Sequence, residues 1–303
     1  MTETGAYMIP TSIKEVKALG WDYIDVILFT GDAFIDHPSF GTAVIARWLQ
    51  KYGYRVAVVP QPNWRDDLRD FRKLGAPRLY FGVNSGAMDS MVNHYTAAKR
   101  LRSDDAYTPE GKAGQRPDYA VTVYTKILKQ IYPDIPVVIG GIEASLRRVT
   151  HYDYWQDALK PSVLVDSGAD YLCYGMGERT MIEFTKAIEA GRNANDIRKI
   201  PQLAFYMDGR SKLKDAVILN SYERCCKDKI AFAENFHVIE TYANMLQPPV
   251  LIEPVGKGYV QINPTWPPAT QQEMDSFWDL PFTKLPHPRY KGKHIPAFEM
   301  IKF

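Results

Sequence analysis

Small and polar residues gather at the ends of four short apolar segments, and they are the residues most able to bind a ligand. They are Thr30, Gly31, Asp32, His37 and Gly41 after the first segment, Asn84 and Ser85 after another, then Gly140, Gly141, Glu143 and Ser145, and last Gly175, Gly177 and Glu178. Glycines let a ligand approach backbone amides closely. For one loop, strand termination is the better explanation. Four such loops on one edge of a sheet favour a binding cleft.

The last of these loops nearly matches the dinucleotide fingerprint G-x-G-x-x-G. In Gly175–Thr180 a threonine replaces the final glycine, and Asp196 is the only nearby acid at the ribose-binding distance. The match falls in the last strand–helix unit, whereas the fingerprint belongs in the first. An NAD site is therefore not expected. A phosphate or another polar group at this helix start stays open.

Other residues able to do chemistry give weaker signals. His37 could bind a metal or a ligand, but a lone loop histidine is more often a turn residue. His151 lies in an aromatic segment that could equally be packed. Arg147 and Arg148 could hold an anion or a partner chain, or could be solvated helix residues. No nucleophile–base triad stands out, so we assign no catalytic residue.

The three cysteines predict neither a disulfide framework nor a metal site. Cys173 is expected to be an inert residue of a buried strand, and the adjacent Cys225 and Cys226 point to different faces of a helix. An odd cysteine count without paired spacing indicates a reducing compartment. No apolar run approaches the length of a membrane span, and the start of the chain is not a signal peptide. The expected location is the cytoplasm.

Length and charge place the chain among ordinary globular proteins. Its 303 residues are 46% hydrophobic, and 37 Lys and Arg oppose 35 Asp and Glu for a formal charge of +2. Such a chain buries enough surface to fold without disulfides or metals. So neutral a balance makes nucleic acid an unexpected partner, and we expect no membrane partner.

Alternating segments predict an α/β fold: a Rossmann-like or flavodoxin-like open parallel sheet with helices on both faces. The expected strands are 25–30, 55–59, 78–82, 137–140 and 170–174, and the expected helices are 39–52, 64–74, 117–132 and 178–190. Ligands of such sheets bind outside the carboxyl ends of the strands, where the strand order reverses. The four polar loops fall at those ends.

Two expected domains follow from changes in composition. Residues 1–195 form the Rossmann-like domain, with a functional or mobile surface insertion near 95–116. Residues 196–303 form a smaller α+β and extended region, with strands at 203–207 and 216–219 and helices at 222–234 and 271–278. Ten of the 21 prolines lie in residues 240–303. We expect this proline-rich tail to wrap across the domain or to lead to a neighbouring one.

Several long motifs resemble one protein family over nearly the whole chain. They are Thr30–Gly41, Gly140–Arg148, His151–Trp155 and Tyr174–Glu178, joined by Tyr259–Pro264, Asp279–Pro281, His287–Pro288 and Ile295–Ala297. They are similar to the amino-terminal region of YgiQ-type radical S-adenosylmethionine (SAM) proteins. Residues 24–191 also resemble the Rossmann-like, B12-binding-type domain that precedes the catalytic barrel in many radical SAM enzymes.

The resemblance implies a [4Fe–4S] cluster, SAM and a catalytic domain that this chain does not carry. In the family, the thiolates of Cys-x3-Cys-x2-Cys hold the cluster, and that motif follows a segment like Ile295–Phe303. No such spacing occurs here, so the chain is expected to be an amino-terminal fragment whose partner is that domain. Cobalamin stays open, because Asp36, His37 and Gly41 do not keep the Asp-x-His-x-x-Gly spacing of a cobalt-binding site.

Three functions are therefore considered. The first is an accessory module that helps to form the substrate site of a radical SAM barrel, with an unassigned substrate. The second is an independent module that binds cobalamin, a nucleotide or another small molecule. The third is a non-catalytic scaffold whose cleft is filled by its own proline-rich tail.

Overall fold

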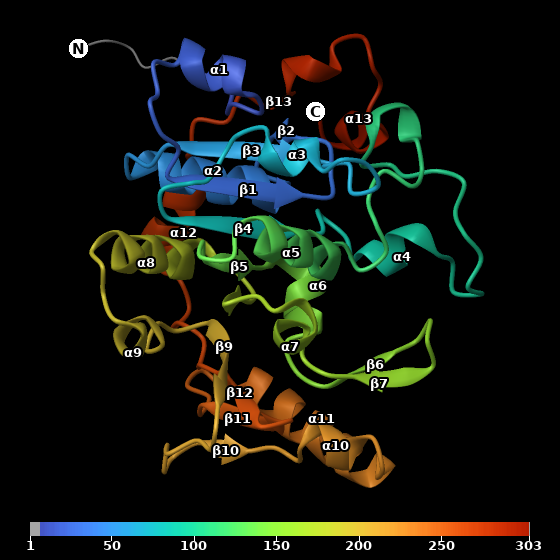
Figure 1. Ribbon diagram of the computed structural model, residues 1–303, viewed down its shortest axis with the longest axis vertical. Coiled ribbons are helices and arrows are strands. Elements are labelled where there is room, and N and C mark those ends of the chain that lie inside the picture. The colour runs from blue at the N-terminus through green and yellow to red at the C-terminus, as the bar shows by residue number, and fades with distance from the viewer. Residues whose placement is uncertain (1–6, 303) are drawn as a thin grey trace.

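The computed structural model describes residues 7–302, and one large sheet organises them (Figure 1). The strands of this sheet are β1 (Val26–Thr30), β3 (Val56–Pro60), β4 (Tyr80–Asn84), β5 (Val137–Ile139), β8 (Tyr171–Cys173), β9 (Leu203–Asp208), β10 (Val217–Ile218), β11 (Leu251–Val255) and β12 (Gly258–Ile262). Two small pairs complete the strands: β2 (Ile35–Asp36) with β13 (Leu285–Pro286), and β6 (His151–Asp153) with β7 (Ala158–Lys160).

Helices cover both faces of the large sheet (Figure 1). They are α1 (Ile13–Ala18), α2 (Gly41–Lys51), α3 (Arg69–Arg72), α4 (Ser90–His94), α5 (Ala120–Ile131), α6 (Gly141–Leu146), α7 (Val163–Ser167), α8 (Glu178–Glu189), α9 (Ala194–Ile197), α10 (Tyr222–Cys225), α11 (Lys229–Ala243), α12 (Gln271–Trp278) and α13 (Pro296–Ile301), with 3-10 turns η1 (Pro109–Gly111) and η2 (Pro288–Tyr290).

The strand order is β10-β11-β12-β9-β8-β5-β4-β1-β3. The five strands from β3 to β8 run parallel, and in chain order they are arranged 2-1-3-4-5. This is the flavodoxin-like order, whose switch point lies between β1 and β4. The predicted α/β class and doubly covered sheet are confirmed.

Side chains of each parallel strand alternate between two buried clusters, one on each face. Val26 and Leu28 of β1 join the cluster that contains Trp48 and Phe184, whereas Ile27 and Phe29 join the opposite cluster. The first cluster includes residues of α2, α8 and the tail, and the second those of α5, α6 and α7. Burial on both faces explains why the strands are continuous apolar runs.

Beyond residue 195 the sheet continues mainly with antiparallel pairs, and only β10 pairs parallel, with β11, in the described chain. β9 pairs antiparallel with β8, and the hairpin of β11 and β12 joins β9 through β12. We expected the strands at β9 and β10 but not this hairpin, because Pro254 within β11 and the proline-rich surroundings read as irregular chain. The division into domains at residue 195 stays a prediction.

Two predicted helices are wrong in extent. Only Arg69–Arg72 of the predicted helix 64–74 is helical, because side-chain oxygens of Asn63, Asp66 and Asp67 accept nearby backbone N–H groups and hold turns instead. The predicted helix 222–234 is split into α10 and α11, since Asp228 caps a new helix by accepting from the Ile230 amide.

The tail crosses the domain, as expected. β13 pairs with β2, the Phe34 amide donates to the Tyr290 hydroxyl over 3.2 Å, and the Ala297 amide donates to the Ala106 carbonyl of the insertion over 2.8 Å. Figure 1 shows the red tail beside the blue start of the chain. These contacts bring the last residues back to the sheet edge that carries the polar loops.

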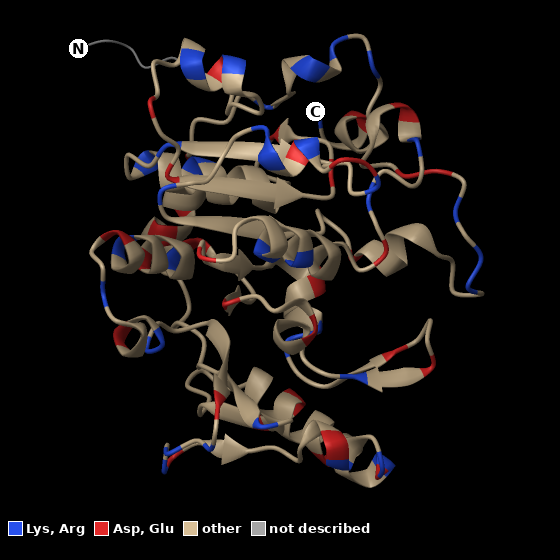
Figure 2. Ribbon diagram, viewed as in Figure 1, with Lys and Arg blue, Asp and Glu red and all other residues tan. Residues whose placement is uncertain are grey.

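Charged residues of both signs are interspersed along the ribbon (Figure 2). This distribution agrees with the formal charge of +2. Within residues 7–302, no helix combines the length and apolar character that crossing a membrane requires.

Candidate functional site

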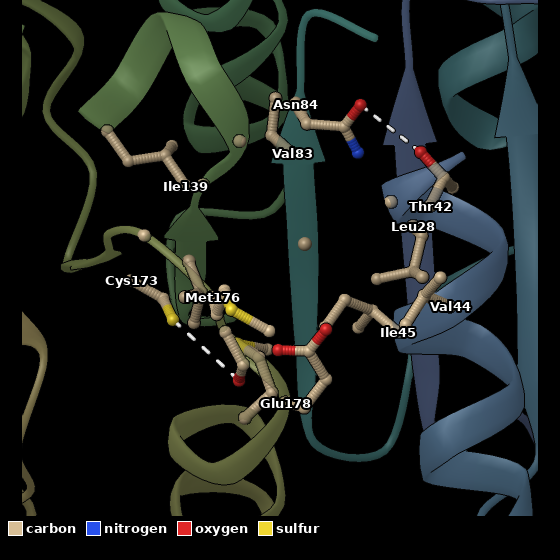
Figure 3. A pocket seen from close by; sticks show the side chains of 18 of the residues that line it. Leu28, Thr42, Val44, Ile45, Val83, Asn84, Ile139, Cys173, Met176 and Glu178 are labelled. Atoms are coloured by element: carbon tan, nitrogen blue, oxygen red, sulfur yellow. Dashed lines mark hydrogen bonds between the residues drawn. The ribbon is translucent and has the colours of Figure 1, made fainter. Parts of the chain in front are cut away.

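A cavity of about 380 Å³ opens at the carboxyl edge of the parallel strands, across the switch point between β1 and β4 (Figure 3). Its lining is Leu28, Pro38, Gly41, Thr42, Val44, Ile45, Gly82, Val83, Asn84, Gly86, Val138, Ile139, Gly140, Gly141, Cys173, Gly175, Met176, Gly177, Glu178, Met181, Phe277 and Trp278. The volume is within the usual range for a small-molecule site. We call it the switch-point cavity.

Glycines keep this cavity open. A Cβ atom on Gly82 would lie 2.5 Å from Cδ2 of Leu28, and one on Gly140 would lie 3.2 Å from the Cys173 carbonyl oxygen. Gly141 has a φ of +77°, a conformation that disfavours any side chain. The glycine-rich loops therefore have the close backbone packing that the sequence predicted.

Asn84 presents a fixed hydrogen-bond donor at one end of the cavity. Its Oδ1 accepts from the Thr30 hydroxyl at 2.8 Å, the Thr42 hydroxyl at 3.2 Å and the Gly86 amide at 2.9 Å. The Gly86 amide can only donate, so the atom that it contacts is the oxygen, which leaves the Nδ2 hydrogens for a ligand. Figure 3 shows the hydrogen bond between this oxygen and the Thr42 hydroxyl.

Glu178 provides a carboxyl group at the other end. It is the first residue of α8, and its carboxyl points across the cavity toward Ile45 (Figure 3). Burial raises the pKa of this carboxyl above its usual value. Behind it, burial raises the pKa of the Cys173 thiol to about 12, so this cysteine is an unreactive thiol as expected.

The structure brings half of the candidate residues to the cavity and leaves the other half behind it. Those that line it are Gly41, Asn84, Gly140, Gly141, Gly175, Gly177 and Glu178. Those that do not are Thr30, Gly31, Asp32, His37, Ser85, Glu143 and Ser145.

Three residues of the second group support the loops. Thr30 orients Asn84, and the Ser145 hydroxyl accepts from the Gly175 amide at 3.2 Å. The buried Glu143 accepts from the amides of Ser90 at 2.8 Å and Val121 at 3.0 Å, and burial raises its pKa.

Gly31, Asp32 and Ser85 belong to a buried cluster around Arg116. The Arg116 guanidinium lies 2.8 Å from Asp32 and donates to the Ser85 carbonyl at 2.7 Å, and a Cβ on Gly31 would lie 2.2 Å from that carbonyl oxygen. His37 is a turn residue, since its Nδ1 accepts from the Ser39 amide at 3.1 Å.

The two arginines after the Gly140–Gly141 loop have internal partners, and neither is a solvated helix residue. Arg147 is buried and lies 2.5 Å from Asp89 and 3.6 Å from Glu143. The Arg148 guanidinium lies over the Tyr174 ring, 5.2 Å from its centroid. Neither arginine lines the switch-point cavity, so neither offers an anion site there.

Sequence reasoning missed one wall of the cavity. Phe277 and Trp278 of α12 close it, although they lie far from the strand ends in the chain. Thr42 and Ile45, on the first turns of α2, were also missed. The sequence did indicate that α2 reaches the cavity, because this amphipathic helix begins directly after a polar loop. Nothing in the sequence around α12 indicates that it reaches the cavity.

The described residues do not suit an iron–sulfur cluster. Cys173 lies in β8, while Cys225 and Cys226 are at α10, and residues 7–302 gather no group of three His, Cys, Asp or Glu side chains able to hold a metal ion. Among the described residues, the cavity lining includes no histidine to serve as a cobalt ligand. The described lining therefore lacks the imidazole that a histidine-ligated corrinoid requires.

Comparison with known proteins shows the family to which the chain belongs. Residues 8–303 match the family model described as Radical SAM N-terminal. The chain is 55% identical over 297 residues to a UPF0313 protein of Porphyromonas gingivalis, covering 97% of this chain and 47% of that protein. A UPF0313 protein of Bacteroides thetaiotaomicron is 53% identical, with coverages of 97% and 50%. This chain thus spans about half the length of these curated relatives.

A solved structure of the radical S-adenosylmethionine methyltransferase TsrM from Kitasatospora setae is also similar, at 22% identity and a TM-score of 0.39, over 59% of this chain and 28% of that one. The family match covers the sheet, the switch-point cavity and the tail that closes it. The chain belongs to the radical SAM N-terminal family.

Proposed function

We propose that this chain is an accessory module of a radical SAM enzyme, and that its switch-point cavity forms part of the substrate site. The observation that carries the proposal is the cavity itself, which four strand-end loops and α12 enclose at the switch point. Family membership and the half-length match to the curated relatives support the accessory role.

The proposal divides the chemistry between two parts of a longer protein. The [4Fe–4S] cluster and SAM are assigned to the other half of the relatives, because the cysteines of this chain lie in separate elements. This chain binds and orients the small molecule on which that half acts. Its three free cysteines support a reducing, cytoplasmic location.

Parallel anaerobic reconstitution tests this division. This chain and the full-length P. gingivalis relative are treated with iron and sulfide, then assayed for iron content, cluster absorption and cleavage of SAM to 5′-deoxyadenosine. We expect a [4Fe–4S] cluster and SAM cleavage in the relative alone. A stoichiometric cluster in this chain, or none in the relative, would overturn the proposal.

An independent ligand-binding module is the second candidate, and the pre-formed cavity favours it because residues of this chain line about 380 Å³ of open space. Cobalamin and nucleotides are the ligands that this alternative names. Titration of this chain with hydroxocobalamin should shift the visible spectrum if cobalamin binds. An unchanged spectrum at high micromolar concentration counts against it.

The scaffold alternative has the least support. It needs the tail to fill the cleft, whereas Phe277 and Trp278 form one wall of a cavity that keeps about 380 Å³ of open space. Gly41 lines the cavity and a Cβ there meets no atom within 4 Å, so a Gly41→Phe variant adds a ring beside the cavity without a clash at its Cβ. We expect this variant to fold and to lose ligand binding.

A further inference from the structure

The two ends of the switch-point cavity have different polarity. Of the described residues that line it, Glu178 is the only carboxylate, and none is Lys, Arg or His. At the opposite end Asn84 and Thr42 stand beside the start of α2 (Figure 3). A ligand that fits both ends must therefore have two polar groups, a donor or cation at the Glu178 end and an acceptor at the Asn84 end.

The Glu178 end requires a hydrogen-bond donor or a cation. The Glu178 carboxyl is half-buried, and within residues 7–302 no basic side chain pairs with it. Its own backbone amide is the one hydrogen-bonding group that lowers its pKa against the larger effect of burial. Removing a carboxylate from water without a partner is unfavourable, so a positively charged ligand group gains by supplying one.

The Asn84 end requires a hydrogen-bond acceptor. Its Oδ1 is held by Thr30, Thr42 and Gly86, while its Nδ2 donates to no group in the described part of the chain. The 11-residue helix α2 starts here without a side-chain cap, and Thr42 in its first turn contacts Asn84. The positive end of the helix dipole therefore lies beside the Asn84 amide, and it too favours an acceptor. An acceptor oxygen is favoured at this point.

The middle of the cavity requires an apolar body. Leu28, Ile45 and Met176 contribute side chains there, and the aromatic rings of Phe277 and Trp278 close the side. The absence of a basic residue from the described lining disfavours phosphate groups, which proteins ordinarily bind with Arg or Lys. Apolar side chains between two polar ends match a compact amphipathic molecule.

We propose that the switch-point cavity selects a small organic amine: its cationic nitrogen pairs with Glu178, its apolar or aromatic body lies between Met176 and α12, and an acceptor oxygen accepts from Asn84 Nδ2. This inference rests on the proposed use of the cavity as a ligand site. The charge and shape of the ligand define it, and residues of this chain determine its specificity.

Isothermal titration calorimetry of this chain at pH 8 tests the selection with four probes. They are tyramine, its neutral analogue 2-(4-hydroxyphenyl)ethanol, its anionic analogue 3-(4-hydroxyphenyl)propionate, and 2-phenylethylamine, which lacks the oxygen. Tyramine should bind at least about tenfold more tightly than the alcohol. The propionate should not bind measurably, and 2-phenylethylamine should bind more weakly than tyramine.

Two variants of α8 locate the effect. Glu178→Gln keeps the shape and should weaken tyramine binding at least about tenfold while leaving the alcohol unchanged. Glu183→Gln is the matched control, because Glu183 is 43% exposed and pairs with Lys186 on the outer side of the same helix. Glu183→Gln should bind all four probes as the unmodified chain does.

Three results would each overturn the proposal. The first is that the alcohol or the propionate binds as tightly as tyramine, the second is that tyramine does not bind, and the third is that Glu178→Gln leaves tyramine binding unchanged. None of these results bears on whether the full-length relative assembles a cluster and cleaves SAM. Failure of the amine selection and failure of the proposed accessory function are therefore separate outcomes.

Discussion

At the scale of single residues, Arg116 is the side chain that joins the insertion to the ends of β1 and β4. Its side chain is 0% exposed, and it pairs with Asp32 at 2.8 Å and with Asp105 at 3.0 Å. Burial raises the pKa of Asp32 to about 6, and the positive charge of Arg116 opposes that rise. The cluster explains why Asp32, a candidate ligand-binding residue in the sequence, faces away from the switch-point cavity.

Arg116→Met should destabilise the fold strongly. The change leaves two buried carboxyl groups without their cation, and loss of one partner of such a cluster costs about 3–5 kcal/mol of the free energy of unfolding. Urea denaturation followed by circular dichroism measures the difference. Arg69→Met is the control, since the Arg69–Asp67 pair is exposed and should contribute nothing measurable. Equal losses in both variants would contradict a special role for Arg116.

Glu253 of β11 predicts a pH dependence of stability. Burial raises the pKa of its carboxyl to about 7, although the Thr150 amide donates to it at 2.9 Å. A carboxyl with a raised pKa in the folded state keeps its proton there. Its stabilising contribution is complete below the unfolded value near 4.5 and is lost as the pH rises through about 7.

Glu253→Gln should therefore flatten the pH profile. Between pH 5 and pH 8 the unmodified chain should lose roughly 2–3 kcal/mol more of its free energy of unfolding than the variant does. Urea denaturation at several pH values gives both curves, and the exposed Glu240→Gln serves as the control. Parallel curves for the chain and Glu253→Gln would show that Glu253 does not hold this proton.

At the scale of elements, α12 is a wall of the cavity that long-range contacts hold in place. Phe277 packs edge-on against Trp48 of α2, with ring centroids 4.8 Å apart. Arg179 of α8 lies 2.5 Å from Glu273, and the Trp266 indole donates to the Thr180 hydroxyl at 3.0 Å. One apolar anchor and these polar contacts therefore fix α12 against the last turns of α2 and the start of α8.

Phe277→Ala should release α12. Truncation of a buried phenylalanine costs about 3–5 kcal/mol, and here the loss falls on the contact that seats this helix. Hydrogen exchange measured by mass spectrometry should show faster exchange of residues 271–278 and unchanged exchange of the parallel strands. Trp278→Ala, at a neighbouring residue that is 55% exposed, should leave the exchange of α12 close to that of the unmodified chain. Unchanged exchange in Phe277→Ala would contradict the anchor role.

At the scale of the whole molecule, the proline-rich tail completes the sheet and then returns to the strand ends. β11 and β12 cover the edge of β9, and β13 with α13 contacts β2 and the insertion. The tail is thus part of the folded body in the described chain. Its two parts have separable roles, the first in the sheet and the second at the cavity.

Two truncations distinguish these roles. A chain that ends at residue 240 loses β11 and β12, exposes the edge of β9, and should unfold or aggregate. A chain that ends at residue 269 keeps both strands and should stay folded, with lower stability and an open cavity wall. Size-exclusion chromatography with light scattering and circular dichroism follow both chains. A soluble, folded 1–240 chain would contradict the role of β11 and β12.

Sequence patterns by themselves determined the parallel part of the fold. The segments that form β1, β3, β4, β5 and β8 are short and apolar. A strand that is buried on both faces requires such a continuous apolar run, so the pattern predicts a parallel sheet covered on both sides. Glycine-rich turns after those strands then placed candidate residues at one edge of the sheet. That inference depends only on local periodicity and on parallel strands ending together.

Only the tertiary structure decided which loop residues face the cavity. Asn84 and Glu178 line it, whereas Asp32 and Glu143 carry the same kind of polar group and turn inward to Arg116 and to backbone amides. Phe277 reaches Trp48 across more than two hundred residues of chain. Local sequence sets strand and helix periodicity, but the direction of a loop side chain depends on partners that folding brings from distant segments.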